Sequence, residues 1–208
     1  MRVRFQNDMA VIDGYVNVVE RDSKMIYENG KHFIEKVKQG AFARSLRRRE
    51  NVRVLLNHDH QRELASVAEG TAVLREDQVG LYCRTVVTDP EVIEKARAGK
   101  LSGWSFGFMP LTEKMTEIDD MDHRDLVELD LREVSILDDT KSPAYPACCI
   151  SARDEDGETV EVRFITDSVN VEDANPGGDA DSSERDEAGN PADGNYSYRN
   201  ALLRAAIH

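Results

Sequence analysis

Leu126-Val-Glu-Leu-Asp-Leu-Arg-Glu-Val-Ser-Ile-Leu137 is the clearest strand pattern in this chain. Side chains alternate between the two faces of a β-strand, so residues two apart share a face. One face carries Val127, Leu129, Leu131, Glu133, Ser135 and Leu137. The opposite face is polar in its first half, as a solvated face should be. The pattern therefore predicts a half-buried strand in which Glu133 points toward the core.

A carboxylate on the core side of a strand needs a partner, because burying an unpaired charge is costly. A histidine N–H group could serve as that partner, and Glu133 would then belong to a reactive site. A structural salt bridge, for example to Arg53, satisfies the carboxylate equally well. The spacing alone leaves these two interpretations open.

Further strands are expected on both sides of this one. Residues 10–19, 52–56, 63–74 and 80–87 are rich in β-branched and apolar residues, and another strand passes through Phe106-Gly-Phe-Met109. Arg75-Glu-Asp-Gln78 is expected to form a turn, and residues 119–125 a polar turn. The pattern predicts a mainly β, α+β fold.

Two helices are expected beside the strands. Residues 33–46 show apolar side chains at helical spacing, with Phe33, Val37, Phe42 and Leu46 directed inward. A second helix is expected from Pro90 to about Ala98. Its ends are marked by an Asp89 N-cap, by proline at the first helical position and by Gly99 after the last turn.

The composition divides the chain of 208 residues into three parts. Residues 1–165 hold most of the apolar residues and are expected to form one domain. Residues 166–197 are rich in Asp, Glu, Asn, Gly, Ser and Pro, and are expected to form a disordered acidic linker. Residues 198–208 could form a short helix, which alone would not be stable in water.

The formal net charge of −13 argues against general binding to nucleic-acid backbones. The one dense basic run, Arg44-Ser-Leu-Arg-Arg-Arg49, is interpreted as a solvated helix face. Cys83, Cys148 and Cys149 do not form a disulfide framework and fit a reducing cytoplasm. The chain lacks a signal-peptide pattern and a membrane-spanning apolar run, so no membrane partner is expected.

Two segments carry residues suited to nucleophilic catalysis. Leu55-Leu-Asn-His-Asp-His60 places His58 at the end of a predicted strand, where a side chain can face a cleft. Leu101-Ser-Gly-Trp-Ser-Phe-Gly-Phe108 places the Ser105 hydroxyl between large apolar residues. A serine becomes a good nucleophile only when a base takes its proton and a third group orients that base. Ser105, His58 and Glu133 supply one residue of each type.

Each segment also has a simpler interpretation. Residues 103–107 match the Gly-x-Ser-x-Gly pattern of α/β-hydrolases, but that elbow follows a strand and precedes a helix, the reverse of the order expected here. Ser102 is a competing hydroxyl, interpreted as a connector between helix and strand. His58 could be an ordinary loop histidine, or His58 and His60 could form a metal clip that lacks a clear third ligand.

The ordered set of motifs resembles the prohead maturation proteases of tailed bacteriophages, which are relatives of the herpesvirus assemblin proteases. The resemblance covers residues 14–152. It rests on Val54-Leu-Leu-Asn-His-Asp59, on Ala98-Gly-Lys-Leu-Ser-Gly-Trp-Ser-Phe-Gly-Phe108, on Leu131-Arg-Glu-Val-Ser-Ile136 and on Pro143-Ala-Tyr-Pro-Ala147. It implies that His58 is the base, Ser105 the nucleophile and Glu133 the acid, with Asp138 as the alternative acid.

The resemblance also implies a small antiparallel β-barrel flanked by helices and a serine endopeptidase that needs no metal or organic cofactor. Its substrate would be the scaffolding segment of the capsid protein, or a scaffolding protein, inside the procapsid in the host cytoplasm. Cleavage of the enzyme's own acidic tail is a further expectation, as is a homodimer like that of the herpesvirus relatives. The alternative is a non-catalytic assembly or scaffolding protein that keeps the same fold.

Overall fold

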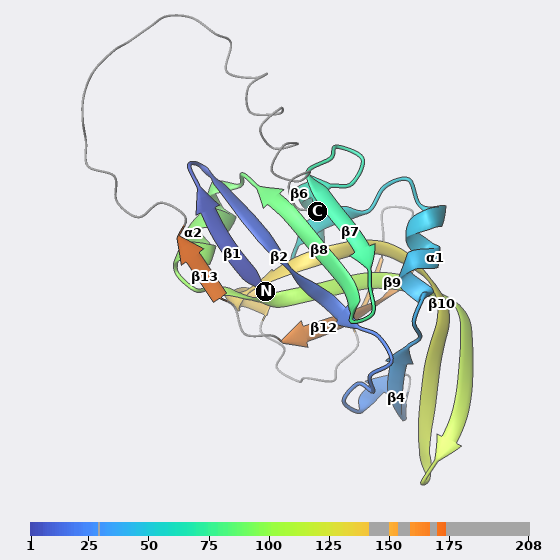
Figure 1. Cartoon of the computed structure of the whole chain (residues 1–208). Coiled ribbons are helices and arrows are strands. Elements are labelled where there is room, and N and C mark those ends of the chain that lie inside the picture. Colours follow the sequence, from blue (N-terminus) through green and yellow to red (C-terminus); the bar gives the residue numbers. More distant parts are fainter. Residues whose placement is uncertain (29, 142–149, 154–158, 167–169, 174–208) are drawn as a thin grey trace, which may run out of the picture.

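The computed structural model describes residues 1–28, 30–141, 150–153, 159–166 and 170–173 (Figure 1). These residues form a mainly β structure with two α-helices, α1 (Ala41–Arg48) and α2 (Pro90–Arg97). The predicted helix at residues 198–208 lies outside the described residues, and so does most of the predicted linker.

One sheet has five strands in the order β13-β1-β2-β8-β7. Their bounds are β1 (Arg2–Gln6), β2 (Met9–Val18), β7 (Ala72–Glu76), β8 (Gly80–Val87) and β13 (Asn170–Asp173). The strand β13 lies in the stretch expected to be an unstructured linker. Four of those residues instead add to the edge of β1 through a parallel backbone ladder.

The other sheet has eight strands and contains the order β11-β12-β9-β10-β4-β3, with β5 paired to β10 and β6 paired to β5. Their bounds are β3 (Ile26–Glu28), β4 (Lys31–Val37), β5 (Arg53–Leu56), β6 (Asp59–Ser66), β9 (Leu101–Ile118), β10 (Met121–Asp138), β11 (Ile150–Arg153) and β12 (Thr159–Thr166). A short 3-10 turn, Asp139–Lys141, follows β10.

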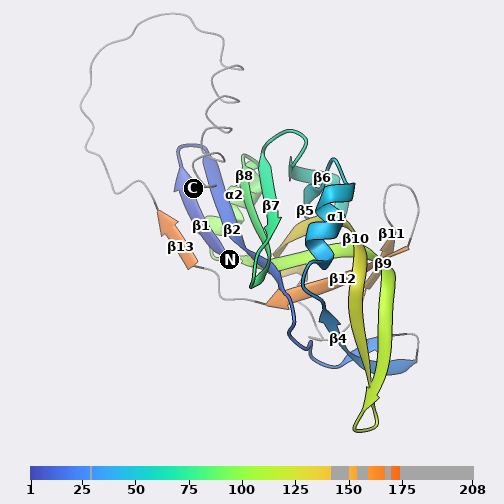
Figure 2. The ribbon, with the colours of Figure 1, turned by 45° about the vertical axis from the view of Figure 1, so that its right-hand side comes forward.

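The two sheets share one hydrophobic core, to which both helices contribute (Figure 2). Ile12 from β2 and Phe106 from β9 are both fully buried in it, and the Phe106 ring packs edge-on against Phe42 of α1. No closed barrel is found among the described residues. The strands β2 and β9 lie against each other, and none of the backbone ladders between described strands joins their two sheets.

The helix expected at residues 33–46 is correct only in its second half. Residues 31–37 form β4, and α1 begins after Gly40, whose φ of 86° turns the chain from strand to helix. Phe33 and Val37 are buried as expected. A spacing of four residues keeps side chains on one face in a strand as well as in a helix, so this spacing did not distinguish the two.

The prediction for residues 63–74 was also too simple, because β6 ends at Ser66 and β7 begins at Ala72. The second helix is confirmed: the Asp89 side chain accepts a hydrogen bond from the Val92 amide, and α2 ends just before Ala98 and Gly99. The turn between β9 and β10 is tighter than expected. It consists of two residues, Asp119 and Asp120, both in left-handed conformations.

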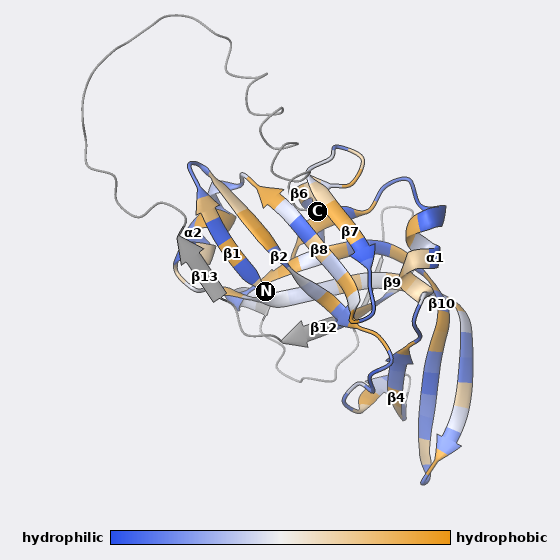
Figure 3. Ribbon diagram, viewed as in Figure 1, coloured by the Kyte–Doolittle hydropathy of each residue, from blue (hydrophilic) through white to orange (hydrophobic). Residues whose placement is uncertain are grey.

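The strands β9 and β10 form a long hairpin whose far end projects from the molecule (Figures 1 and 3). At that end Leu111, Met115 and Ile118 are about half exposed. At the opposite end the same two strands lie in the core, where residues 101, 103–108 and 133–138 are buried. This buried end positions the residues singled out in the sequence.

Candidate active site

The His58 imidazole lies between the Ser105 hydroxyl and the Glu133 carboxylate. Its Nε2 atom is 2.7 Å from Ser105 Oγ, and its Nδ1 atom is 2.7 Å from Glu133 Oε1. Both separations are hydrogen-bond distances. A neutral imidazole that donates from Nδ1 to the carboxylate leaves Nε2 free to accept the serine proton.

Ser105 lies in β9, in the interior of the larger sheet. Its Cα is opposite Ser135 of β10 on one side and opposite Phe164 of β12 on the other. The residue is 0% exposed. The hydroxyl oxygen is also 2.8 Å from the carbonyl oxygen of Arg163. The serine therefore has two acceptors, an imidazole and a peptide carbonyl, for a single proton.

His58 lies in the two-residue turn between β5 and β6. Asn57 and His58 have φ values of 55° and 60°, the left-handed pair that a tight type I′ hairpin requires. A histidine in this conformation is uncommon. The Asn57 amide donates to the Ile136 carbonyl, and the Asn57 side-chain oxygen accepts from the Asp138 amide. These bonds hold the turn against β10 and bring the imidazole over the sheet.

Glu133 is 2% exposed, as the alternation of the strand predicted. Its Oε1 atom faces His58, and its Oε2 atom accepts a 2.6 Å hydrogen bond from Ser135 Oγ. Ser135 in turn accepts from the His58 backbone N–H at 3.0 Å. One serine thus holds both the carboxylate and the backbone of the histidine.

Gly107 gives the carboxylate its space. It pairs with Glu133 across β9 and β10, and a Cβ atom at this position would lie 2.6 Å from Glu133 Oε1. That distance is too short for any side chain to be tolerated without a shift. The roles of Gly107 and Ser135 were not predicted from the sequence, although Ser135 lies on the same predicted strand face as Glu133.

The predicted alternative of an Arg53–Glu133 salt bridge is wrong. In the described part of the chain, the contacts of the Glu133 carboxylate are to His58 and Ser135. Arg53 instead contacts His60 Nδ1 at 2.9 Å and Glu63 at 3.4 Å. No group of three His, Cys, Asp or Glu side chains that could hold a metal ion occurs among the described residues.

Asp138, the alternative acid, is bound elsewhere. It is fully buried and forms a 2.6 Å ion pair with Lys95 of α2, and it also accepts from the amide and hydroxyl of Thr140. Burial raises the pKa of this carboxyl, but the bonds from Lys95 and Thr140 outweigh that effect and lower the pKa below its ordinary value. Asp138 thereby joins α2 to the end of β10.

Two other residues singled out in the sequence, Ser102 and Cys83, lie within strands. Ser102 lies within β9 rather than in a connector between helix and strand as expected, and its Oγ donates to the Asp138 carbonyl of β10. Cys83 is buried, and burial raises the pKa of its thiol. Cys148 and Cys149 lie outside the described residues. Neither helix among the described residues has the length and apolar character needed to cross a membrane.

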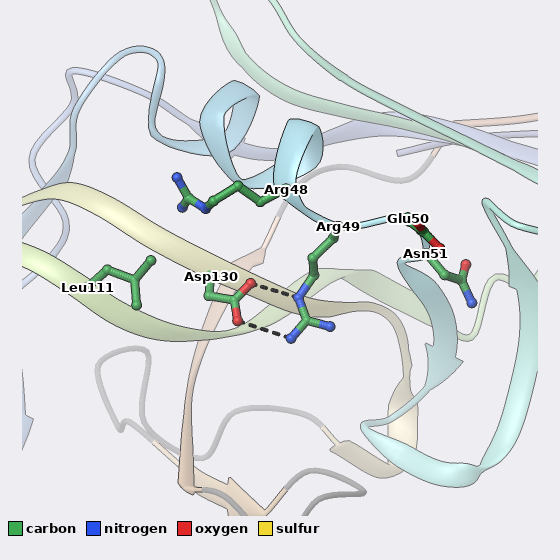
Figure 4. Close-up of a pocket in the computed structure, with 6 residues that line it drawn as sticks. All are labelled: Arg48, Arg49, Glu50, Asn51, Leu111 and Asp130. Atoms are coloured by element: carbon green, nitrogen blue, oxygen red, sulfur yellow. Dashed lines mark hydrogen bonds and ion pairs between the residues drawn. The ribbon is translucent and has the colours of Figure 1, made fainter.

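The prediction that the basic run is a solvated helix face is correct in part, because Arg47 and Arg48 are exposed whereas Arg44 and Arg49 are partly buried. Arg44 and Arg48 donate to the carbonyls of Val127 and Leu129 of β10, and Arg49 forms two hydrogen bonds with Asp130 (Figure 4). The hollow in Figure 4 is lined by Arg48, Arg49, Glu50, Asn51, Leu111 and Asp130. Among these lining residues, Arg48 and Arg49 attach the end of α1 to β10.

A hydroxyl, an imidazole and a carboxylate joined by hydrogen bonds are the arrangement that serine peptidases use. This geometry therefore fits the class of serine peptidases. The comparison with known families agrees. The family model described as Caudovirus prohead serine protease matches residues 1–163, and the chain belongs to this family. The protein is accordingly a serine peptidase of bacteriophage capsid maturation. No curated protein and no solved structure shows significant similarity to the chain.

Proposed function

We propose that Ser105, His58 and Glu133 are the nucleophile, base and acid of an endopeptidase that cleaves the scaffolding segment of a capsid protein inside the procapsid. The observation that carries this proposal is the pair of 2.7 Å contacts on either side of the His58 ring. Family membership supports a capsid protein as substrate. The likeness to herpesvirus assemblin proteases belongs to the same proposal, and a mainly β fold with flanking helices supports it.

The reaction would be acyl transfer in two steps. His58 Nε2 takes the Ser105 proton as Oγ forms a bond to the peptide carbonyl carbon, and Glu133 stabilises the imidazolium that results. The imidazolium then gives its proton to the leaving amine nitrogen as the C–N bond breaks. Water, deprotonated by the same imidazole, hydrolyses the ester and restores the serine. Backbone N–H groups would stabilise the oxyanion.

Mixing the purified protein with the capsid protein of the same virus tests the main claim. The wild-type enzyme should cut the capsid protein at a defined site, identified by mass spectrometry, and Ser105→Ala should not. If both proteins fold and neither cuts, the chain acts as a non-catalytic assembly protein, which is the alternative that the sequence left open.

Self-cleavage is a separate part of the proposal. On incubation, the wild-type protein should lose mass from its acidic C-terminal part, and Ser105→Ala should stay intact. Equal loss from both proteins would identify a contaminating protease and reject self-processing. Homodimerisation would appear as a concentration-dependent molar mass in light scattering.

A further inference from the structure

The strand β12 lies directly along the strand that carries Ser105. It pairs antiparallel with β9, with Val162 opposite Gly107 and Phe164 opposite Ser105. The other edge of β9 is taken by β10. The edge that β12 covers is therefore the one along which an extended peptide could add to β9 beside the nucleophile, as peptides commonly add to an open sheet edge.

The contact between β12 and the nucleophile has a chemical consequence. Ser105 Oγ is 2.8 Å from the Arg163 carbonyl oxygen and 2.7 Å from His58 Nε2. The hydroxyl has one proton to donate. A hydroxyl that donates to Arg163 does not donate to the imidazole, so the base cannot withdraw its proton. The Arg163 carbonyl thus competes with His58 for the bond that activates the serine.

The Arg163 side chain fastens β12 to the rest of the sheet. Its guanidinium binds both oxygens of Glu35 in β4, at 2.6 and 2.8 Å. Both residues are buried, with Glu35 4% and Arg163 9% exposed. Such a two-pronged pair between arginine and carboxylate is geometrically specific as well as strong. We call this pair the Arg163–Glu35 latch.

Arg124 of β10 lies beside the latch and contacts both strands. It binds Glu35 at 3.1 Å and Glu161 of β12 at 2.6 and 2.9 Å. Burial raises the pKa of Glu161, but the bonds and charges of Arg124 and Arg163 outweigh this and lower it. If β12 left, Arg124 would still neutralise Glu35. Release would therefore not leave a buried carboxylate without a counter-charge, which would be costly.

We propose that β12 is a self-inhibitory strand that occupies the substrate edge of β9, held by the Arg163–Glu35 latch, and that its release frees the Ser105 hydroxyl and this edge for an external extended peptide. The inference rests on the proposed role of Ser105 as nucleophile. It adds that the full chain is held in a closed state while β12 is in place.

A fluorophosphonate probe tests this in the full chain. In the labelling reaction Ser105 Oγ bonds to phosphorus, the P–F bond breaks, fluoride leaves and the proton passes to His58. We expect Glu35→Gln and Arg163→Lys each to be labelled at least about fivefold faster than the wild type, the change expected when one buried charged hydrogen bond is weakened. Circular dichroism would establish that each variant is folded. One folded latch variant is enough for the test.

Glu113→Gln is the matched control. Glu113 also binds Arg124 but is 44% exposed and belongs to the projecting hairpin, so its substitution should leave the rate unchanged. Equal rates in the wild type and the folded latch variants would overturn the inference, as would equal acceleration by Glu113→Gln. If the wild type and every variant fail to react, the proposed function itself fails, and the inference falls with it.

A measurement on the wild type alone gives a second test. Hydrogen exchange would be compared before and after Ser105 is labelled, because the bulky adduct cannot coexist with the Arg163 carbonyl at its present position. Amide exchange in residues 159–166 should rise at least about fivefold, whereas residues 80–87 of β8 should not change. Unchanged exchange in β12 after complete labelling would contradict the proposal.

Discussion

Glu133 and Asp138 are two buried carboxylates five residues apart on the same strand, and they differ in their partners. Glu133 faces an imidazole and a serine hydroxyl. Asp138 faces the ammonium of Lys95, with Thr140 as a further donor. Glu133 and Asp138 are 2% and 0% exposed. Burial therefore does not decide which carboxylate can take part in chemistry.

The hydrogen-bond or ion-pair partner of each carboxylate determines whether that carboxylate can take part in chemistry. A carboxylate held by a permanent cation is fully committed to its ion pair, and here that pair joins α2 to the end of β10. A carboxylate held by an imidazole and a hydroxyl can stabilise a positive charge that appears only during the reaction. Glu133 is therefore expected to serve the chemistry and Asp138 the stability of the fold, and substitutions can separate these two roles.

The largest contrast is expected in activity. Glu133→Gln should lower kcat by roughly 10³- to 10⁴-fold, because the amide no longer holds the imidazole in the useful tautomer. Asp138→Asn should retain kcat within about threefold at a temperature where it is folded, since this residue does not touch the imidazole ring. Both would be measured as cleavage of the capsid protein under saturating conditions.

Thermal unfolding of both variants is the control for this comparison. Glu133→Gln must be folded for its loss of activity to count. A reversed result, with Glu133→Gln active and folded Asp138→Asn inactive, would move the acid to Asp138 and break the assignment made here.

A smaller effect is expected at Ser135, which holds both Glu133 and the His58 amide. Ser135→Ala should lower kcat by about 10-fold, because it removes two hydrogen bonds that orient reacting groups. The KM should stay nearly unchanged. Ser102→Ala is the matched control, since Ser102 binds only a strand carbonyl, at 3.1 Å. Equal kcat values for the two variants would show that Ser135 does not position the site.

The smallest contrast is in acid stability. The Asp138 pKa is lowered from its ordinary 3.8 in the folded protein, so the carboxylate contributes stability above pH 3.8 that is lost as the pH falls through the folded value. Asp138→Asn should therefore lower the free energy of unfolding by about 2 kcal/mol near neutral pH. In urea titrations this difference from the wild type should shrink below pH 3.8. A constant difference down to pH 3 would reject the ion-pair explanation.

Local patterns in the sequence predicted much of the site. Alternation along β10 predicted that Glu133 points inward, and the position of His58 after a strand predicted a residue at the rim. The contacts that separate Glu133 from Asp138 were not predictable in this way. Lys95 lies 43 positions before Asp138, and Arg163 lies 58 positions after Ser105. Neither of these separations along the sequence can be predicted from the two-residue period of a strand or the 3.6-residue period of a helix.

The same limit explains the errors in the fold. Phe33 and Val37 fit a helix face and a strand face equally well, and the ladders of β4 with β10 and β3 favour the strand. The type I′ turn at His58 was also not expected, because asparagine followed by glycine is its usual signature. Gly107 could not be connected with Glu133 until the register of β9 and β10 was known.

Mapping a fluorophosphonate adduct by tandem mass spectrometry tests the central claim most directly. We expect one adduct, on Ser105, that is absent in Ser105→Ala and that forms at least about 10³-fold more slowly in His58→Ala. An adduct on another serine, or labelling of Ser105 at an undiminished rate in folded His58→Ala, would contradict the proposed relay between His58 and Ser105.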